Sequence, residues 1–204
     1  MLSNLFRELC QQFTNDNSRI EAYWQEVETN YSAKERHYHT LTHLENLVNE
    51  IGPLKQEIQN RFAVLFAVFY HDIIYIPGKN NNEEESALLA AERMSFMGCG
   101  RKITAATTAI IRATSSHLST GDSDCDLFTG ADLSILGKDE ETYNQYAQQV
   151  RKEFTIYPDA IYNPGRKQVL QHFLSMTRIY KTDHFYNTYE KAARRNLERE
   201  ISLL

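Results

Sequence analysis

Residues that interrupt regular structure are scarce in this sequence. Glycine occurs 8 times and proline 4 times among 204 residues. A many-stranded β-fold needs turn residues about every ten positions, so this scarcity argues against one. Hydrophobic residues make up 42% of the chain and charged residues 24%, which is typical of a globular protein. The composition therefore favours a helical fold, and the length favours one domain that covers residues 1–204.

Cysteine is also scarce. The three cysteines, Cys10, Cys99 and Cys125, form no Cys-x-x-Cys pair and cannot all be joined in disulfides. This spacing argues against a zinc site built from cysteines, and unpaired thiols are typical of a reducing compartment. We therefore expect buried or incidental thiols and a cytoplasmic location.

Long apolar stretches are absent. The longest one, from Phe62 to Tyr70, has nine residues, whereas a helix needs about 20 to cross a bilayer. The first ten residues include Arg7 and Glu8, so they lack the apolar centre of a signal peptide. We expect neither a membrane span nor a signal peptide.

The chain has no surplus of positive charge. It carries 22 Lys and Arg against 27 Asp and Glu, for a net charge of −5. Stable binding to a nucleic-acid duplex needs basic residues that neutralise the phosphates, so we expect none. A small phosphorylated molecule can still bind at a local site. The sequence leaves open whether the chain forms a homodimer.

Hydrophobic residues recur at helical spacing along most of the chain, and alternating strand patterns are absent. This pattern predicts an all-α, single-domain bundle. Capping boxes at Ser18 with Glu21 and at Asn82 with Glu85 mark two helix starts. The predicted helices cover about residues 18–30, 41–51, 54–69, 82–97, 102–116, 139–155, 165–179 and 183–202, with a short apolar helix around Asp132 that ends at Gly137. We expect the polar residues 115–126 to form a loop.

The predicted helix from Leu54 becomes apolar on all sides toward Phe69, which is typical of a helix that enters a core. It would carry His71 and Asp72 into the interior. A buried carboxylate is costly unless it is paired or bound to a cation, so this His-Asp pair is a candidate metal site. Asp132 is a second carboxylate within an apolar segment. A helix N-cap and a buried metal ligand are equally good interpretations of this residue.

Histidines cluster near the start of the second predicted helix. His37, His39 and His43 lie within seven residues, in RHYHTLTH. His39 and His43 are four positions apart, so both rings would project from one face if the helix begins one turn early. The alternative is a histidine-rich helix end that lies in solvent.

Four of these residues form a plausible metal-binding set. His43, His71, Asp72 and Asp132 offer two nitrogens and two carboxylates. Such a set suits one divalent ion, such as Mn, Fe, Zn, Ni, Co or Mg, with positions left for water and a phosphate oxygen.

This order of residues resembles the HD-domain metal-dependent phosphohydrolases. Further stretches resemble a small single-domain branch of that superfamily, namely RHYHTLTHL, FYHDIIYIPGKNNNEEESA, ADLSILG, GRKQVLQHFL, IYKT and ARRNLEREI. The resemblance covers nearly the whole chain and implies a helical bundle that holds its metal through His43, His71, Asp72 and Asp132. The branch commonly has an acid at the position of Gly130.

The resemblance also implies a reaction. YHTLTHL is similar to a segment of the cyclic-nucleotide phosphodiesterases in which the first histidine is the general acid and the second binds metal, so His39 is the expected acid. The implied activity is hydrolysis of a phosphate ester or anhydride on a small molecule, with nucleotides among the candidates. A metal-activated water would attack, and Asp72 would orient it or accept its proton.

Four further residues are candidates for substrate contacts. Arg36 has a guanidinium that suits phosphate, although a surface ion pair explains it equally well. His117 could contact a phosphate or a second metal, or lie solvated in a loop. The family resemblance makes Asn82 and Glu83 supporting groups of the site, whereas helix capping explains both without a function.

Two other functions stay open. The first is a non-catalytic sensor of HD type that binds a metal and a nucleotide, or a partner protein. The second is a di-iron oxygenase of HD type, which would need more ligands than the four above. No P-loop, nucleophile elbow or reactive-cysteine arrangement is present.

Overall fold

Helices account for all of the regular structure of the chain, which the computed structural model describes from residue 1 to residue 204. The prediction of an all-α fold is confirmed. The α-helices are α1 (Leu2–Cys10), α2 (Asn17–Tyr31), α3 (Leu41–Ile51), α4 (Arg61–Tyr70), α5 (Asn82–Phe96), α6 (Arg101–Ala113), α7 (Ser123–Asp132), α8 (Glu140–Glu153), α9 (Asp159–Ser175) and α10 (Asp183–Leu203). Two short 3-10 helices are η1 (Gly52–Leu54) and η2 (Leu133–Gly137).

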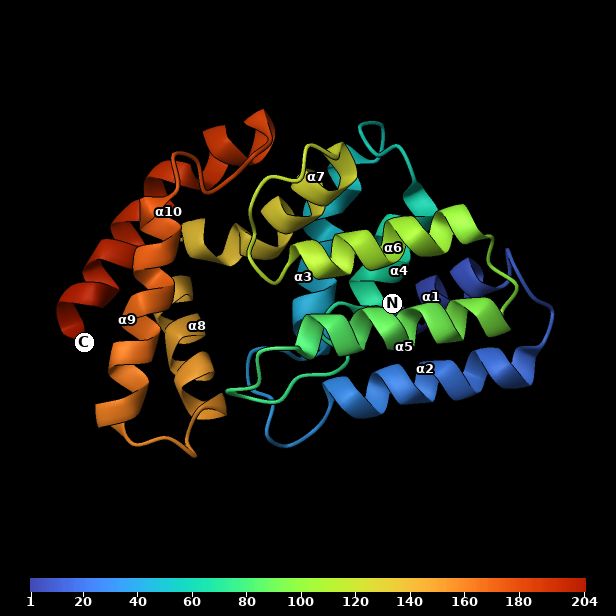
Figure 1. Cartoon of the computed structure of the whole chain (residues 1–204), viewed down its shortest axis with the longest axis horizontal. Coiled ribbons are helices and arrows are strands. Elements are labelled where there is room, and N and C mark those ends of the chain that lie inside the picture. Colours follow the sequence, from blue (N-terminus) through green and yellow to red (C-terminus); the bar gives the residue numbers. More distant parts are fainter.

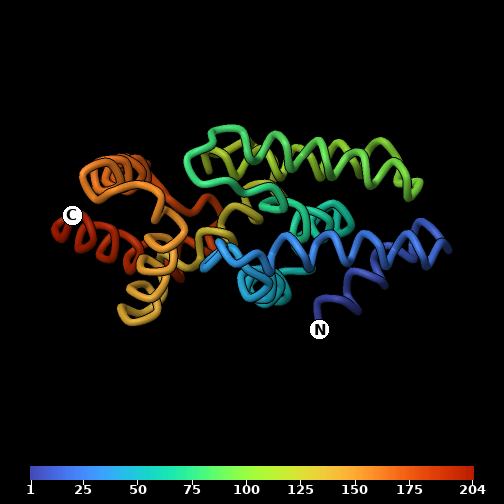
Figure 2. The backbone as a smooth tube through the Cα atoms, turned by 90° about the horizontal axis from the view of Figure 1, so that it is seen from below, coloured from blue at the N-terminus to red at the C-terminus, as the bar shows by residue number.

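The helices form two groups. Helices α1 to α7 lie on one side of the molecule and α8 to α10 on the other (Figure 1). The view from below shows the same separation (Figure 2). Helix α7 packs against α3 and α6, and η2, which follows it, packs against α8 and α10. The junction of α7 and η2, where Asp132 lies, therefore connects the two groups.

Helix α4 forms the centre of the larger group. All of its residues from Phe66 to Tyr70 are buried, as expected from their apolar character. The helix does not begin at Leu54 as predicted. It begins at Arg61, and Asn60 is its N-cap. The carboxylate of Asp124 in α7 accepts the N–H groups of residues 59 and 60 at 2.8 and 2.7 Å, which fixes this start. Contacts that a local pattern does not contain thus set the boundary.

Other boundaries also differ from the predicted ones. Asp16, not Ser18, caps α2 by accepting the N–H of Arg19 at 3.0 Å. Helix α7 begins at Ser123, inside the segment expected to be a loop. Helix α9 begins at Asp159, before the predicted start at residue 165, and it continues through Pro164. The amphipathic helix α1 was not part of the prediction, and its buried residues join the core.

All three cysteines are unpaired, as the sequence predicts. A single hydrophobic core of 42 buried residues includes members of both helix groups. None of the helices combines the length and the apolar character that crossing a membrane requires.

Candidate metal centre

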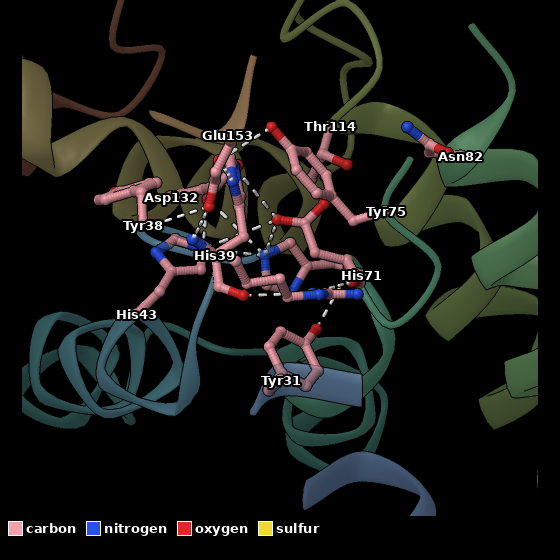
Figure 3. A network of polar contacts seen from close by, with 12 residues as sticks. Tyr31, Tyr38, His39, His43, His71, Tyr75, Asn82, Thr114, Asp132 and Glu153 are labelled. Carbon is pink, nitrogen blue, oxygen red and sulfur yellow. Dashed lines mark hydrogen bonds and ion pairs between the residues drawn. The ribbon is translucent and has the colours of Figure 1, made fainter. Parts of the chain in front are cut away.

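Three helices meet at the cluster of His43, His71 and Asp132. His43 lies in the first turn of α3, His71 follows the last residue of α4, and Asp132 ends α7. Both histidines are buried and Asp132 is partly buried. Figure 3 shows the side chains directed toward one another.

The donor atoms of this cluster have the spacing of metal ligands. The two histidine Nε2 atoms are 3.1 Å apart, and Oδ1 of Asp132 is 3.2 Å from that of His43 and 3.8 Å from that of His71. Ligands bound at about 2.1 Å to one ion are separated by about 3.0–3.5 Å. Three potential ligand atoms thus lie within 4.8 Å of one another. This cluster can bind a metal ion.

Asp72 lies beside this cluster. Its Oδ2 is 3.1 Å from Nε2 of His71 and 3.9 Å from Nε2 of His43. The backbone N–H of Asp72 donates to the hydroxyl of Tyr31 at 3.2 Å, which helps to fix the residue. The carboxylate faces the two histidine nitrogens, but it is not one of the three mutually close ligands. Its role as a fourth ligand stays a prediction.

Hydrogen bonding orients His71 for metal binding. Its Nδ1 lies 3.2 Å from the carbonyl oxygen of Val68 in α4. A proton on Nδ1 donated to this carbonyl leaves Nε2 free to bind a cation. Burial alone would lower the pKa of His71, but the charge and hydrogen bond of Asp72 outweigh it and raise the pKa to about 9. A bound cation and a proton therefore compete for His71.

The rest of the cluster favours a positive ion. Burial lowers the pKa of His43, which favours the neutral imidazole that metals bind. Burial would raise the pKa of Asp132, but hydrogen bonds from His117 and His43 hold it well below its usual range. The carboxylate is thus ionised, and the site combines negative charge with a neutral nitrogen donor.

His39 lies near the metal cluster, but it does not lie on the helix face that the sequence predicts. Helix α3 begins at Leu41 with Thr40 as its N-cap, so His39 precedes the helix and does not share a face with His43. The turn before α3 nevertheless brings the ring centroids of His39 and His43 to 5.9 Å. Nε2 of His39 is 3.9 Å from Oδ2 of Asp72. His39 therefore flanks the cluster without joining it.

Glu153, the last residue of α8, supports His39 and was missed in the sequence. Its Oε1 accepts three backbone N–H groups, from residues 37, 38 and 39, at 2.7, 2.7 and 3.0 Å. Its Oε2 lies 2.7 Å from Nδ1 of His39 and accepts the hydroxyl of Tyr75 at 3.0 Å. The backbone partners lie 114 to 116 residues away in sequence and Tyr75 lies 78 residues away, and a glutamate at a helix end carries no signal of them.

The pair of His39 and Glu153 is polarised, because each residue shifts the pKa of the other toward its charged form. Burial would raise the pKa of Glu153, but the hydrogen bonds and charge of His39 lower it to about 2. Burial would lower the pKa of His39, but Glu153 and the charge of Asp72 raise it above its ordinary value. The imidazole therefore tends to hold a proton on Nε2, the nitrogen that faces the metal cluster.

Arg36 binds backbone carbonyls, unlike the phosphate clamp that the sequence suggests. Its Nη1 donates to the carbonyls of His39 and Asp72 at 3.2 and 2.7 Å, and its Nη2 donates to that of Ile73 at 2.8 Å. The guanidinium is buried over the ring of Tyr31. Both terminal nitrogens already donate to backbone carbonyls, so Arg36 holds the chain around Asp72.

His117 lies at the site and is not a solvated loop residue. Its Nε2 is 3.0 Å from Oδ2 of Asp132, the oxygen opposite the one that faces the histidine pair. The residue has a φ of 53°, a strained conformation for a non-glycine residue. His117 thus orients Asp132, and its predicted contact with a second metal or a phosphate stays untested.

Asn82 lies apart from the cluster (Figure 3), and Glu83 follows it in α5. Asn82 is the first residue of α5, where Asn81 takes the N-cap position. Its side chain accepts the N–H of Ile76 at 3.1 Å and donates to the carbonyl of Ile76 at 3.0 Å. Figure 3 shows Asn82 apart from the histidines. Asn82 therefore shapes the loop before α5, and Glu83 is half-buried in the first turn of that helix.

A cavity of about 470 Å³ opens beside the cluster. His39, His117 and Asp132 are among its lining residues. The remaining wall comes mostly from η2, α8 and α9, and 13 of the 18 lining residues are hydrophobic. A molecule bound here would lie against both the metal cluster and His39.

No family model, curated protein or solved structure matches the chain.

Proposed function

We propose that the protein hydrolyses a phosphate ester or anhydride on a small molecule with the help of one divalent metal ion. The observation that carries this proposal is the convergence of His43, His71 and Asp132 beside the polarised pair of His39 and Glu153. Metal ligands and a proton donor at one end of a cavity are the parts that such a reaction requires.

The ligand residues and the metal ion have separate proposed roles. His43, His71 and Asp132 hold the ion, with Asp72 as the proposed fourth ligand. When bound, the ion supplies positive charge to the phosphoryl oxygens and lowers the pKa of a coordinated water toward neutrality. Asp72 can also accept a proton from the attacking water.

His39 is the proposed general acid. Its Nε2 faces the cluster, and Glu153 holds its Nδ1, so the ring presents a proton where the leaving oxygen would lie. His117 acts through Asp132, whose carboxylate it orients.

Elemental analysis and a screen for phosphate release test this proposal. The protein is purified without added metal, and phosphoesters are then assayed with Mn²⁺, Mg²⁺, Ni²⁺ and Co²⁺. His43→Ala should lose both metal and activity, whereas His39→Ala should keep the metal and lose about 10²- to 10⁴-fold in turnover. His37→Ala, which removes an exposed neighbouring histidine, is the matched control and should leave both unchanged.

A substrate whose leaving group has a low pKa distinguishes the role of His39 from that of His43. Nitrophenyl phosphate needs little protonation of its leaving oxygen, so it should restore turnover in His39→Ala but not in His43→Ala. Loss of metal from His39→Ala would make His39 a ligand. Metal binding by the wild-type protein without any phosphate release would instead favour the sensor, and oxygen consumption with two bound irons would favour the oxygenase.

A further inference from the structure

The cavity beside the metal cluster has a continuous apolar wall. Ile161, Gly165, Val169 and Phe173 all line it, and they are spaced four residues apart along α9. Residues at this spacing lie on one face of a helix. Val150 of α8 also lines the cavity.

Amide side chains, lysine and small hydroxyl residues are missing from the cavity wall. No Asn, Gln, Ser, Thr, Lys or Glu lines it. Its one arginine, Arg166, donates to Glu200 at 2.8 and 3.0 Å, and both side chains are largely buried. This positive charge is already neutralised, so it does not attract further phosphates of a polyphosphate chain. The other polar groups outside the metal cluster are tyrosine hydroxyls, of Tyr38, Tyr75, Tyr146, Tyr157 and Tyr162, and those of Tyr75 and Tyr146 already bond to Glu153 and Arg166. With so few polar groups besides these hydroxyls, the wall favours an apolar group over a base or sugar.

Apolar residues continue from the cavity to its rim. Ile161 and Val169 line the cavity and are 60% and 45% exposed, and the nearby Ile156, in the segment between α8 and α9, is 71% exposed. Exposed hydrophobic side chains next to a pocket often mark the binding site of an apolar group. The cavity volume lies within the range of small-molecule sites, about 300–1,000 Å³.

We propose that the molecule bound at this centre is a phosphate monoester whose phosphate is attached to an apolar group, and that this group fills the cavity along α9. The inference rests on the proposed function for the placement of the phosphate at the metal cluster. In the reaction, water adds to phosphorus and the bond between phosphorus and the alcohol oxygen breaks. The alcohol oxygen keeps that electron pair and takes a proton from His39, and Asp72 accepts the proton that the water loses, which then returns to His39 through solvent. The products are an apolar alcohol and inorganic phosphate.

Gly165 allows the cavity to be filled by a single substitution. A Cβ atom added there has no other atom within 4 Å, so a larger side chain has room. Gly165→Phe should occupy the space that the apolar group needs. Gly165→Ala is the matched control, because it changes the same helical position and adds only one methyl group.

Binding of phosphonates, which are not hydrolysed, tests the inference by calorimetry on the Mn²⁺-loaded protein. Octylphosphonate should bind at least about 100-fold more tightly than methylphosphonate, since each buried methylene is worth about fourfold in affinity. Adenosine monophosphate should bind more weakly than octylphosphonate. Gly165→Phe should reduce the octyl-to-methyl ratio to below tenfold, while Gly165→Ala should preserve it.

Val169→Asp provides a second variant that alters the half-exposed rim and not a buried position. It should reduce the same ratio. Equal binding of octyl- and methylphosphonate by the wild-type protein, or tighter binding of adenosine monophosphate, would overturn the inference. Tight octylphosphonate binding without hydrolysis of octyl phosphate would uphold the binding site and overturn the proposed catalytic function.

Discussion

Among single residues, Glu153 connects the turn before α3, the ring of His39 and the hydroxyl of Tyr75. One carboxylate accepts hydrogen bonds from three backbone N–H groups, the ring of His39 and the hydroxyl of Tyr75. It thereby fixes the turn before α3 and attaches it to α8. A buried carboxylate with all its partners satisfied is stable, but it becomes costly when a partner is lost.

This residue should make stability dependent on pH. The pKa of Glu153 is lowered from 4.5 in the unfolded chain to about 2 in the folded protein. Its contribution is therefore fully present above pH 4.5 and is lost as the pH falls toward 2. A shift of this size corresponds to about 3 kcal/mol of unfolding free energy.

Denaturant unfolding of Glu153→Gln measures the effect. The variant should be less stable than the wild type by about 2–3 kcal/mol at pH 7, and the difference should shrink as the pH falls from about 4.5 toward 2. Glu141→Gln, at an exposed position of the same helix, is the control and should change little. A difference that is the same at pH 3 and pH 7 would contradict the prediction.

At the scale of helices, the metal cluster joins three elements. His43, His71 and Asp132 come from the start of α3, the end of α4 and the end of α7. Without a cation, two ionised carboxylates, Asp72 and Asp132, face the same small space. Removing an ion from this junction should therefore weaken the contact between the helices.

Thermal melting with and without metal tests this expectation. A chelator should lower the melting temperature and added Mn²⁺ should restore it, because a ligand at 100 times its dissociation constant stabilises by about 2.7 kcal/mol. His43→Ala should abolish the response, and His37→Ala should retain it. A melting temperature that no divalent ion changes would argue against the metal centre.

The sequence predicts the helices better than it predicts their starts. The apolar spacing locates α3 and the end of α4, and with it the burial of His71. The start of α4 is not predictable locally, because Asp124 of another helix fixes it. A polar composition also hides the start of α7, where Asp122 caps the helix by accepting the N–H of Cys125.

Part of the site is predictable from the sequence, because some of its residues lie where a local pattern gives them a chemical role. His71 and Asp132 are predictable because buried charge and imidazole in apolar segments require a partner, and His43 is predictable from the cluster of histidines at helical spacing. The convergence of His39 with them follows from a turn and not from a shared helix face. Glu153 and the apolar cavity depend on the position of α8 and α9, which the spacing of residues does not contain.

At the scale of the whole molecule, close packing against α10 holds the two helix groups together. Gly130 and Gly137 lie on either side of Asp132, and Cβ atoms added to them would meet Phe185 at 2.6 Å and Tyr189 at 2.5 Å. A larger side chain at the position of Gly130 would therefore displace Phe185. The absence of side chains here lets α10 approach the segment that carries Asp132.

Two glycine substitutions test this packing. Gly137→Ala should destabilise the protein by about 1–3 kcal/mol, because the added methyl group would also lie 2.8 Å from the backbone oxygen of Tyr189. Gly165→Ala meets no atom and lies within α9, so it should stabilise slightly, by about 0.5–1 kcal/mol. The free energies of unfolding of the two variants provide the comparison, and equal effects would contradict the packing argument.

The separation of the metal ligands along the chain also has a kinetic consequence. His43 and His71 are 28 residues apart, and Asp132 comes from a still later helix. The three donors meet only after long-range contacts have formed, so an ion has little to bind while the chain is still folding. A bound ion should therefore leave the refolding rate nearly unchanged and slow unfolding, which extends the lifetime of the native state.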